Sequence, residues 1–300
     1  MLNNDLKVLI LGSTGLAGSE FKRQLKKIEG ITLIGVARKN AEINADLGDA
    51  SKVKELLSEI KPGIVINAAA TIDIDACEQN PEGTYKINTG LPRLLAEKSG
   101  SFDRILQIST DHYHSGIEPH AFKESEPVEL INEYARQKFS SERYLLNCKN
   151  ALVLRTNIVG IRGWKHPTFG EWALNVVDGN RRCSLFNDFW TSGIDVGTFV
   201  KHAINQTIFG NASGLFNIGS RDVYSKLDFV LEIARQKNKR LDNYSVASFK
   251  NLKTKRANSL GLDSSLMENY LESKLPPMET VVKNLIYSQS ERTHEVQNRI

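Results

Sequence analysis

The sequence contains little cysteine and no long apolar run. Its 300 residues include three cysteines, Cys77, Cys148 and Cys183, and none belongs to a Cys-x-x-Cys pair. Sparse cysteines exclude a disulfide framework and argue against a structural zinc site. The apolar runs are far shorter than the ~20 residues of a membrane-spanning helix, and the polar start at residues 1–5 lacks the pattern of a signal peptide. We therefore expect a cytoplasmic protein with no membrane partner.

The sequence also lacks a large excess of one charge. It has 39 basic and 35 acidic residues, a net charge of +4, and the two signs are mostly interspersed. Nucleic-acid-binding proteins usually concentrate positive charge and interleave it with aromatic residues, so we expect no nucleic-acid partner. Internal repeats and low-complexity segments are absent as well. The length permits one main domain that carries a smaller second one.

Short apolar, β-branched runs alternate with helical stretches through the first half of the chain. The expected strands are 7–11, 31–37, 64–67, 104–109 and 151–155, and the expected helices are 16–28, 53–60, 82–98 and 132–147. Nearly continuous apolar strands that alternate with helices indicate a parallel sheet covered on both faces. Right-handed crossovers then predict a doubly wound, Rossmann-type α/β fold.

Beyond residue 155 this alternation loosens. Residues 160–170 resemble a loop, 215–218 a short strand, and 196–208, 226–237 and 280–287 helices. We predict a dinucleotide-binding domain over 1–155 with returning segments near 186–210, and a smaller C-terminal substrate-binding lobe mainly over 156–288. Residues 289–300 are polar and are predicted to form a disordered tail.

A glycine-rich segment follows the first expected strand directly. It reads Gly12-Ser13-Thr14-Gly15-Leu16-Ala17-Gly18, with glycines spaced G-x-x-G-x-x-G. Glycines allow a sharp turn and bring backbone N–H groups against a pyrophosphate at the positive end of the next helix. Glycine also serves ordinary turns, but a strand before and a helix after it favour dinucleotide binding.

The end of the second expected strand bears on the choice of cofactor. An acidic residue there would bind the ribose 2′-hydroxyl of NAD. This sequence instead has Arg38-Lys39, and its first carboxylate afterwards is Glu42. Two cations suit the 2′-phosphate of NADP, although basic pairs are also common on surfaces. We therefore predict that NADP(H) is preferred over NAD(H).

Three candidate catalytic residues are Thr110, Tyr134 and Lys138. Thr110 lies in the segment Ser-Thr-Asp at the end of the fourth strand, while Tyr134 and Lys138 are one helical turn apart. A nearby ammonium favours the phenolate and draws the pKa of a tyrosine from ~10 toward neutrality. Tyr270 and Lys274 have the same spacing without a strand-borne hydroxyl upstream, so the spacing alone is weak evidence.

Together these features resemble the extended short-chain dehydrogenase/reductase family over nearly the whole chain. Asn67 and the alanines after it, Ala68, Ala69 and Ala70, are similar to the family's cofactor-facing motif at the end of the third strand. Asp46-Leu47 resembles its adenine-contacting pair, and Asn88 resembles its helix asparagine near the nicotinamide ribose. The resemblance implies that these residues bind the cofactor together with the glycine loop, Tyr134 and Lys138.

Within that family the chain looks most like the dTDP-4-dehydrorhamnose reductases. The matching segments are NAAATIDIDACE from residue 67, STDHYHSG from 109, RTNIVG from 155, FNDFWTSGIDV from 186 and RANSLGLD from 256. The resemblance implies NAD(P)H-dependent reduction of the C4 ketone of a nucleotide-activated 6-deoxyhexose, with surface polysaccharide synthesis as the expected pathway. Family analogy also suggests a homodimer.

Two segments depart from the pattern of these reductases. Ser-Thr-Asp is followed by His112-Tyr113-His114 rather than Tyr-Val-Phe, and Arg-Thr by Asn157-Ile158 rather than a small residue and a tryptophan. An aliphatic residue cannot offer the same flat surface to a sugar, so we expect a reshaped pocket, for which Trp164 or Trp190 could compensate. The candidate substrate residues are Asp111, His112, Asn157, Ile158 and Arg256, the last because a guanidinium matches phosphate oxygens.

A metal site is not expected. His112 and His114 lie two apart, but the sequence offers no third ligand nearby. Contact with substrate hydroxyls and plain loop packing are both open for these histidines.

Two other functions remain open. A nucleotide-sugar dehydratase would carry an acidic pair directly after the strand-end hydroxyl, and this chain has His112 and Tyr113 after Asp111. An epimerase retains NAD tightly, which fits poorly with the Arg-Lys pair. The chain also resembles the regulatory beta subunit of methionine adenosyltransferase, which binds NADP without reducing a sugar. An intact catalytic trio favours catalysis over that role.

Overall fold

The computed structural model describes residues 6–297, and their side chains up to residue 292. The chain forms two compact units. Residues up to 110, 130–155 and 200–216 make the first, and 111–129, 156–199 and those from 217 onward make the second. The polar start at 1–5 and the last three residues of the predicted tail lie outside the described residues. Within the described part, no helix combines the length and apolarity needed to cross a membrane.

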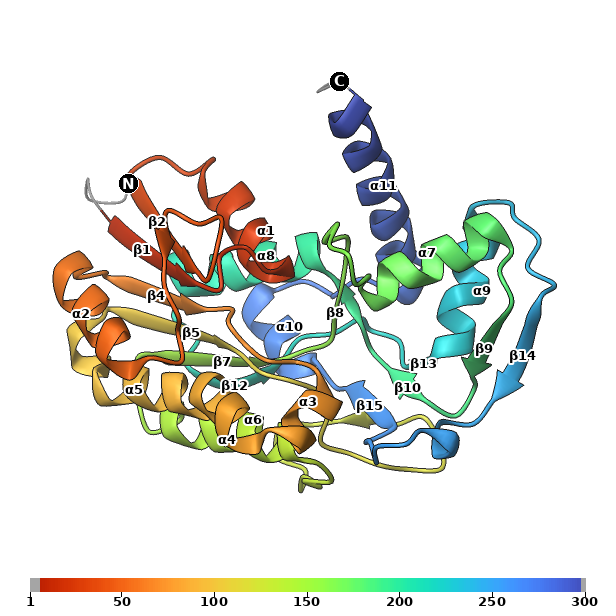
Figure 1. Ribbon diagram of the computed structural model, residues 1–300, viewed down its shortest axis with the longest axis horizontal. Coiled ribbons are helices and arrows are strands. Elements are labelled where there is room, and N and C mark those ends of the chain that lie inside the picture. Colours follow the sequence, from red (N-terminus) through yellow and green to blue (C-terminus); the bar gives the residue numbers. More distant parts are fainter. Residues whose placement is uncertain (1–5, 298–300) are drawn as a thin grey trace. The chain divides into compact units, whose positions relative to one another are not determined.

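A seven-stranded sheet forms the centre of the first unit (Figure 1). Its order is β12 (Gly214–Asn217), β7 (Ala151–Arg155), β5 (Arg104–Ile108), β4 (Ile64–Asn67), β1 (Leu6–Leu11), β2 (Ile31–Ala37) and β3 (Ile43–Asn44). Every pairing from β7 to β3 is parallel. The order reverses direction between β1 and β4, so the predicted doubly wound Rossmann-type fold is confirmed.

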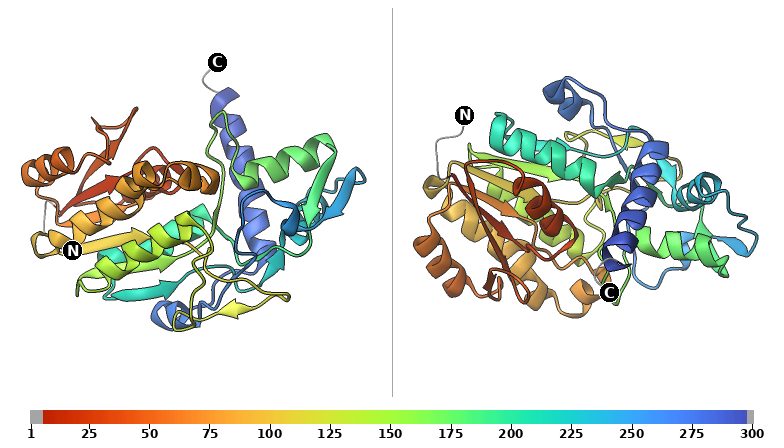
Figure 2. Two further views of the ribbon diagram at one scale, coloured as in Figure 1. Left: turned by 60° about the horizontal axis from the view of Figure 1, so that its bottom comes forward. Right: turned by 90° about the horizontal axis from the view of Figure 1, so that it is seen from above.

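Helices cover both faces of this sheet, as Figures 1 and 2 show from three sides. They are α1 (Leu16–Leu25), α2 (Ala50–Ile60), α3 (Ile74–Gln79), α4 (Pro81–Tyr85), α5 (Leu91–Glu97), α6 (Glu133–Leu145) and the end of α8 (Val196–Ile204), with the short turns η1 (Lys86–Gly90), η2 (Ser99–Ser101) and η3 (Asn205–Phe209). Because these strands are parallel, their carboxyl ends lie at one edge of the sheet. Residues far apart in the sequence, such as those after β1, β4 and β5, therefore meet at that edge.

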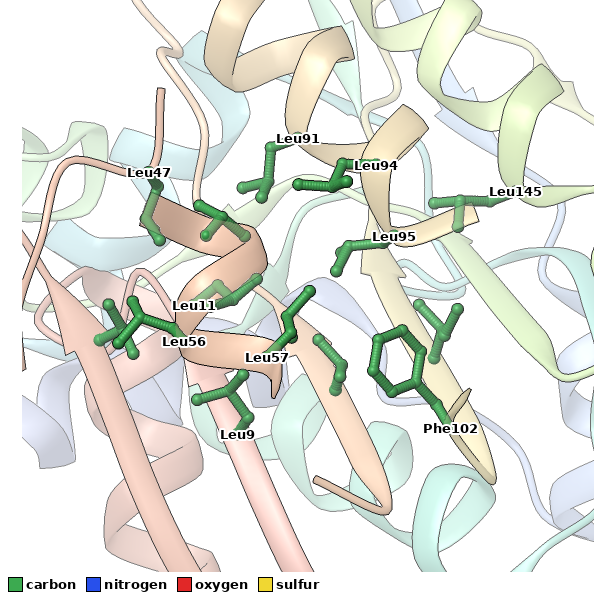
Figure 3. Packing of buried hydrophobic residues seen from close by; sticks show 14 of the residues in the cluster. Leu9, Leu11, Leu47, Leu56, Leu57, Leu91, Leu94, Leu95, Phe102 and Leu145 are labelled. Atoms are coloured by element: carbon green, nitrogen blue, oxygen red, sulfur yellow. The ribbon is translucent and has the colours of Figure 1, made fainter. Parts of the chain in front are cut away.

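A leucine-rich core covers one face of the central sheet. Leu9 and Leu11 point to this face and pack with leucines of α2, α5 and α6, among them Leu57, Leu95 and Leu145 (Figure 3). All five are at most 8% exposed, and burying one leucine contributes ~1.5–3 kcal/mol. Such a core holds β1 and α6 rigidly, and these two elements carry the glycine loop and the predicted catalytic side chains.

Some boundaries differ from those that the sequence predicts. The single helix expected over 82–98 is divided by the π-helical turn η1, where Asn88 and Thr89 bond to α6. Residues 111–129 group with the second unit rather than the first, because β6 (Ala121–Phe122) pairs with β15 (Ser259–Leu262). The last helix, α11 (Met278–Gln297), continues past residue 287, where Gln289 bonds to Lys237.

The second unit contains short strands and four α-helices in its described residues. A four-stranded sheet has the order β13 (Tyr224–Ser225), β10 (Trp190–Thr191), β15 and β6, and two strand pairs join β11 (Ile194–Asp195) to β8 (Ile158–Val159) and β14 (Tyr244–Ala247) to β9 (Cys183–Phe186). The helices are α7 (Phe169–Gly179), α9 (Lys226–Gln236), α10 (Ser265–Leu271) and α11, with the turn η4 (Phe249–Asn251). A hydrophobic core joins α7, α9 and α11.

Candidate active site

The glycine loop turns directly out of β1 and into α1. Gly12 has a φ of +81°, and a β-carbon there would lie 2.8 Å from the backbone of Ala69. A β-carbon on Gly18 would overlap the backbone oxygen of Gly12. These two positions therefore require glycine, because the loop backbone approaches its neighbours too closely for any side chain.

The N-terminus of α1 is suited to an anion. Gly15 is the N-cap residue, no side chain caps the helix, and the first turn has no acidic residue. Ser13 is 1% exposed, and its Oγ has no hydrogen-bond partner among the described residues. Open N–H groups at the positive end of a helix, beside an unsatisfied hydroxyl, fit the pyrophosphate of a dinucleotide.

Asn67 shapes the neighbouring strand end. Its amide donates to Gln107 Oε1 on β5 at 2.8 Å, and its Oδ1 accepts from the N–H of Ala69. Ala68 donates to the carbonyl of Leu11 at the end of β1. The turn after β4 is thereby tied to the glycine loop, next to which the cofactor-facing alanines were predicted.

The residues after β2 leave two cations accessible. Arg38 and Lys39 are exposed, whereas the carboxylate of Glu42 forms an ion pair with Lys22 of α1 at 2.6 Å. The hydrogen bond from Lys22 lowers the pKa of Glu42. The first carboxylate after β2 is therefore already neutralised by a lysine.

The predicted adenine-contacting pair has structural roles of its own. Leu47 is buried in the hydrophobic core, and Asp46 accepts a hydrogen bond from the N–H of Gly48 at 2.9 Å. Their contact with a cofactor stays a prediction.

The catalytic helix α6 is capped and its functional face is buried. The side chain of Asn132 accepts from the N–H of Ala135 and so begins the helix two residues before Tyr134. Tyr134 is 6% exposed and packs with Cys77. Lys138 is 2% exposed, and its Nζ donates to the carbonyl of Ile108 at 2.7 Å. This bond ties the helix to the end of β5, two residues before Thr110, so the predicted trio shares the first unit.

A buried ion pair lies one turn beyond Lys138. The guanidinium of Arg155 binds the carboxylate of Glu142 through Nε and Nη2, the latter at 2.8 Å, and Ser109 Oγ donates to Glu142 at 2.5 Å. Burial lowers the pKa of Lys138 to about 8, while the charge of Glu142 acts in the opposite direction. Desolvation thus brings the pKa of this ammonium closer to neutral pH.

Asn88 is engaged in a network of buried amides. Its Oδ1 accepts from the N–H of Thr71 at 2.8 Å, and its Nδ2 donates to the Thr71 carbonyl and to Gln137 Oε1, both at 3.0 Å. Gln137 lies between Tyr134 and Lys138, and its own backbone oxygen accepts from Thr89. The Asn88 side chain therefore holds α6, and a role near the nicotinamide ribose stays a prediction.

The second Tyr-x-x-x-Lys pair has a different environment. Tyr270 is 47% exposed, and Lys274 forms an ion pair with Glu268 at 2.6 Å near the surface. Burial therefore separates the predicted catalytic pair from the one to which the sequence assigns no chemistry.

In the second unit, Asp111 and Asn157 meet as candidate substrate residues. Asp111 is 1% exposed, and its Oδ2 accepts from Asn157 Nδ2 at 2.8 Å and from Thr191 Oγ1 at 3.5 Å. Burial raises the pKa of Asp111 to about 7, against the lowering effect of these bonds and of Lys226. The carboxylate can therefore gain or lose a proton near neutral pH.

The other predicted substrate residues surround this carboxylate less tightly. His112 Nε2 lies 3.8 Å from Asp111 Oδ1, and burial with the nearby charges of Lys226 and Arg256 lowers the pKa of His112 to about 3. Ile158 begins β8 and pairs with Ile194. Its role in a reshaped pocket stays a prediction.

The neighbouring aromatic residues are held by local contacts. His114 is buried and stacks on Phe122, with ring centroids 3.8 Å apart, which favours loop packing. Trp164 is 51% exposed beneath the guanidinium of Arg162, and Trp190 begins β10. Among the described residues, no group of three or more His, Cys, Asp or Glu could hold a metal ion.

Three residues that the sequence did not single out act on predicted site residues of their own unit: Gln137, which bonds to Asn88; Glu142, whose charge raises the pKa of Lys138; and Lys226, whose charge lowers the pKa of Asp111. Gln137 and Glu142 lie on the buried face of α6, so helical periodicity counted from Tyr134 and Lys138 could have indicated them. Lys226 begins α9 in the second unit, where no motif marks it.

Comparison with known proteins identifies the family. A sequence model described as the RmlD substrate binding domain matches residues 6–290. The "probable low-salt glycan biosynthesis reductase Agl14" of Haloferax volcanii is 27% identical over 231 residues, which are 73% of this chain and 76% of that one. A dTDP-4-dehydrorhamnose reductase of Escherichia coli is 24% identical over 240 residues, 77% of this chain and 79% of its own.

Solved structures agree in fold. The dTDP-4-dehydrorhamnose reductase of Bacillus anthracis, crystallised with NADP, has a TM-score of 0.83 and 20% identity, covering 96% of this chain and 99% of its own. At that identity the likeness shows the fold, while the family match extends over almost the whole chain. The chain therefore belongs to the RmlD substrate binding domain family, nicotinamide-dependent oxidoreductases among the extended short-chain dehydrogenases/reductases.

Proposed function

We propose that the protein uses NADPH to reduce the C4 ketone of a nucleotide-activated 6-deoxyhexose, in the synthesis of a surface polysaccharide. The observation that carries this proposal is the buried position of Tyr134 and Lys138 on α6, with Lys138 bonded to the strand end that leads to Thr110. The related reductases named above support the choice of substrate.

The reaction divides among three side chains. The bound dinucleotide would supply a hydride to the ketone carbon. Thr110 donates a hydrogen bond that holds the ketone oxygen, and Tyr134 transfers its phenolic proton to that oxygen as the alkoxide forms. The ammonium of Lys138 stabilises the phenolate that remains, and Glu142 keeps positive charge on Lys138.

The preference for NADPH rests on the residues after β2. Arg38 and Lys39 are exposed and available to a 2′-phosphate, while the pairing of Glu42 with Lys22 removes the carboxylate that would favour an unphosphorylated ribose. Replacing both cations by alanine should lower kcat/KM for NADPH by on the order of tenfold or more and leave that for NADH nearly unchanged.

The test is turnover with a panel of 4-keto-6-deoxy sugars carrying dTDP, UDP, GDP or CDP. The loss of reduced nicotinamide is followed by absorbance, and the panel member with the highest kcat/KM names the nucleotide. Tyr134→Phe should lower the rate by ~10²–10⁴, the usual contribution of a general acid. The matched control is Tyr270→Phe, at an exposed tyrosine with the same spacing to a lysine, and it should retain full activity.

The same experiment, with the parent nucleotide hexoses added to the panel, decides between the reductase and the two other functions. Tight NADPH binding without oxidation of any panel member would refute the reductase and favour a regulatory subunit. Loss of water from a parent hexose, or interconversion of epimers, with no net consumption of NADPH, would favour a dehydratase or an epimerase.

A further inference from the structure

The buried carboxylate of Glu142 joins three elements of the first unit. Glu142 lies on α6, one turn after Lys138, and is 0% exposed. Its Oε1 accepts from the Oγ of Ser109, the residue directly after β5, at 2.5 Å. Its Oε2 accepts from Nη2 of Arg155, the last residue of β7, at 2.8 Å, and Arg155 Nε donates to both oxygens. One carboxylate therefore connects a helix with the carboxyl ends of two neighbouring strands.

Stability alone does not account for an ion pair at this place. Removing two charges from water is costly, and well-packed apolar residues often replace a buried pair without loss of stability. The three elements already meet in the leucine-rich core, through Leu145 of α6, Ile105 of β5 and Val153 of β7. A buried pair with defined partners can instead fix one arrangement of the elements that it joins.

Two bonds from α6 fix the residues directly before Thr110. Lys138 Nζ donates to the carbonyl of Ile108 at 2.7 Å, and Glu142 accepts from the hydroxyl of Ser109. The N–H of Ser109 also donates to a carbonyl of β7, again at 2.7 Å. The helix and the neighbouring strand thus hold this short segment together, and Thr110 follows it without an intervening residue.

The bond from Ser109 also separates the roles of two adjacent hydroxyls. Ser109 directs its hydroxyl to Glu142, whereas the hydroxyl of Thr110 is the one assigned to the ketone. The ketone oxygen has to meet Thr110 and Tyr134 at the same time, so the strand end has to keep its position relative to α6. A misplacement of about 1 Å can lower a rate by ~10²-fold.

We propose that Glu142 is a positioning residue of the reductase: anchored by Arg155, it holds Ser109 and thereby sets the hydroxyl of Thr110 against the catalytic face of α6. The inference rests on the proposed function, from which the roles of Thr110 and Tyr134 come. Glu142 acts through Ser109 and needs no contact with the substrate.

Ser109→Ala is the sharpest test, because it removes the bond to Glu142 and leaves every charge in place. Ser109→Thr keeps the hydroxyl and is the conservative variant, while Glu142→Gln keeps the length of the side chain and removes its charge. The matched control is Ser140→Ala, at a serine of α6 whose hydroxyl donates to the carbonyl of Arg136 in the same helix. The kcat, the KM for the sugar nucleotide, the dissociation constant of NADPH and the pH profile are measured for each full-length variant.

Loss of the bond should affect the chemical step rather than binding. Ser109→Ala should lower kcat by about tenfold to a hundredfold, while KM and the dissociation constant of NADPH stay within about twofold of the wild type. Its pH profile should keep the wild-type shape, and Ser109→Thr should restore most of kcat. Glu142→Gln should also lower kcat and move the alkaline limb of the profile to lower pH, because its charge raises the pKa of Lys138.

A kcat of Ser109→Ala within about twofold of the wild type would overturn the proposal. So would losses of substrate and NADPH affinity as large as the loss of kcat, because they show general disruption of the fold. If Glu142→Gln does not fold, Ser109→Ala still decides, since it keeps the pair of Glu142 and Arg155.

Hydrogen exchange tests the same anchor without turnover. In the full chain saturated with NADP, exchange of the Ser109 and Thr110 backbone N–H groups, followed by mass spectrometry, should be about tenfold faster when Ser109 is alanine. Ser140→Ala should leave it unchanged. Equal protection in Ser109→Ala and the wild type would overturn the proposal. A wild type that reduces no member of the sugar panel, but shows the expected exchange, would refute only the reductase, so the two proposals fail separately.

Discussion

Replacing Lys138 by methionine tests whether the catalytic lysine is held at a cost in stability. The side chain is 2% exposed, and among the described residues its ammonium donates one hydrogen bond, to the carbonyl of Ile108. Methionine has nearly the same length and fills the same apolar space without the charge. The variant should lose reductase activity. Its free energy of unfolding, compared with that of the wild type, should change with pH because burial lowers the pKa of Lys138.

The magnitude follows from the pKa of this ammonium. At pH 7 the folded and the unfolded chain both carry the proton, so the cost of burying the charge is fully present. A pKa lowered from 10.5 to about 8 corresponds to about 3 kcal/mol. Removing the donor costs the Ile108 carbonyl one of its two hydrogen bonds, because Gln107 Nε2 also donates to it at 2.7 Å, and the loss of a bond to a charged group costs ~1.5–3 kcal/mol. The methionine variant should therefore equal the wild type at neutral pH or exceed it by up to about 2 kcal/mol.

Raising the pH should reverse this order. Between about pH 8 and 10.5 the unfolded chain retains a proton that the folded chain has released, so the wild type gains stability relative to the variant. By about pH 10 the free energy of unfolding of the wild type, measured relative to that of the variant, should have risen by about 2 kcal/mol. Only the difference between the two proteins is used, because other groups that titrate in this range are common to both.

Urea denaturation at neutral pH and at about pH 10, followed by far-ultraviolet circular dichroism, measures this difference. Lys201→Met, at an exposed lysine of α8, is the control and should show no comparable pH dependence. A stability difference between wild type and Lys138→Met that is the same at both pH values would refute the reasoning, since it would mean that the folded state imposes no cost on the charge.

Three further changes probe the elements that support the site. Arg155→Met removes the cation that binds the buried carboxylate of Glu142 and should destabilise the protein by ~3–5 kcal/mol in urea denaturation. A loss below ~1 kcal/mol would contradict the burial of this pair. Gln137→Ala removes a partner of Asn88 and should cost ~1–3 kcal/mol and lower kcat, with NADPH affinity unchanged by titration. Gly18→Ala places a carbon against the backbone of the glycine loop and should weaken NADPH binding by on the order of tenfold or more. An unaltered dissociation constant would contradict the role of this loop in binding the pyrophosphate.

The fold could be predicted because its signals are local and periodic. Apolar strands such as 64–67 are buried on both faces, and the glycine loop follows its strand without an insertion. The turn η1 could not be predicted, because helical periodicity continues through it. It arises from tertiary hydrogen bonds of Asn88 and Thr89 to Gln137, 49 and 48 residues away in the chain. Such bonds leave no periodic trace in the sequence.

The candidate site shows the same division between local and tertiary information. Tyr134 and Lys138 were identified by the order of three motifs, and the structure places them on a buried face of α6. The assignment of Asn88 to the ribose relied on family resemblance, whereas its amide is bonded to Thr71 and Gln137. The sequence does not show whether the amide of an asparagine faces a ligand or a neighbouring helix. The hydrogen-bond partners of that amide become known only from the structure.

Two lysines of this chain show why residue type and spacing are insufficient. Burial lowers the pKa of both Lys138 and Lys226 to about 8, but the ammonium of Lys138 is bonded to a backbone carbonyl, while that of Lys226 lies over the rings of Phe169 and Phe189. The first lysine is therefore held in position by the fold before any substrate binds. Burial alone therefore does not mark a catalytic lysine, and the hydrogen bond that holds Lys138 against the end of β5 is the information that residue type and spacing do not contain.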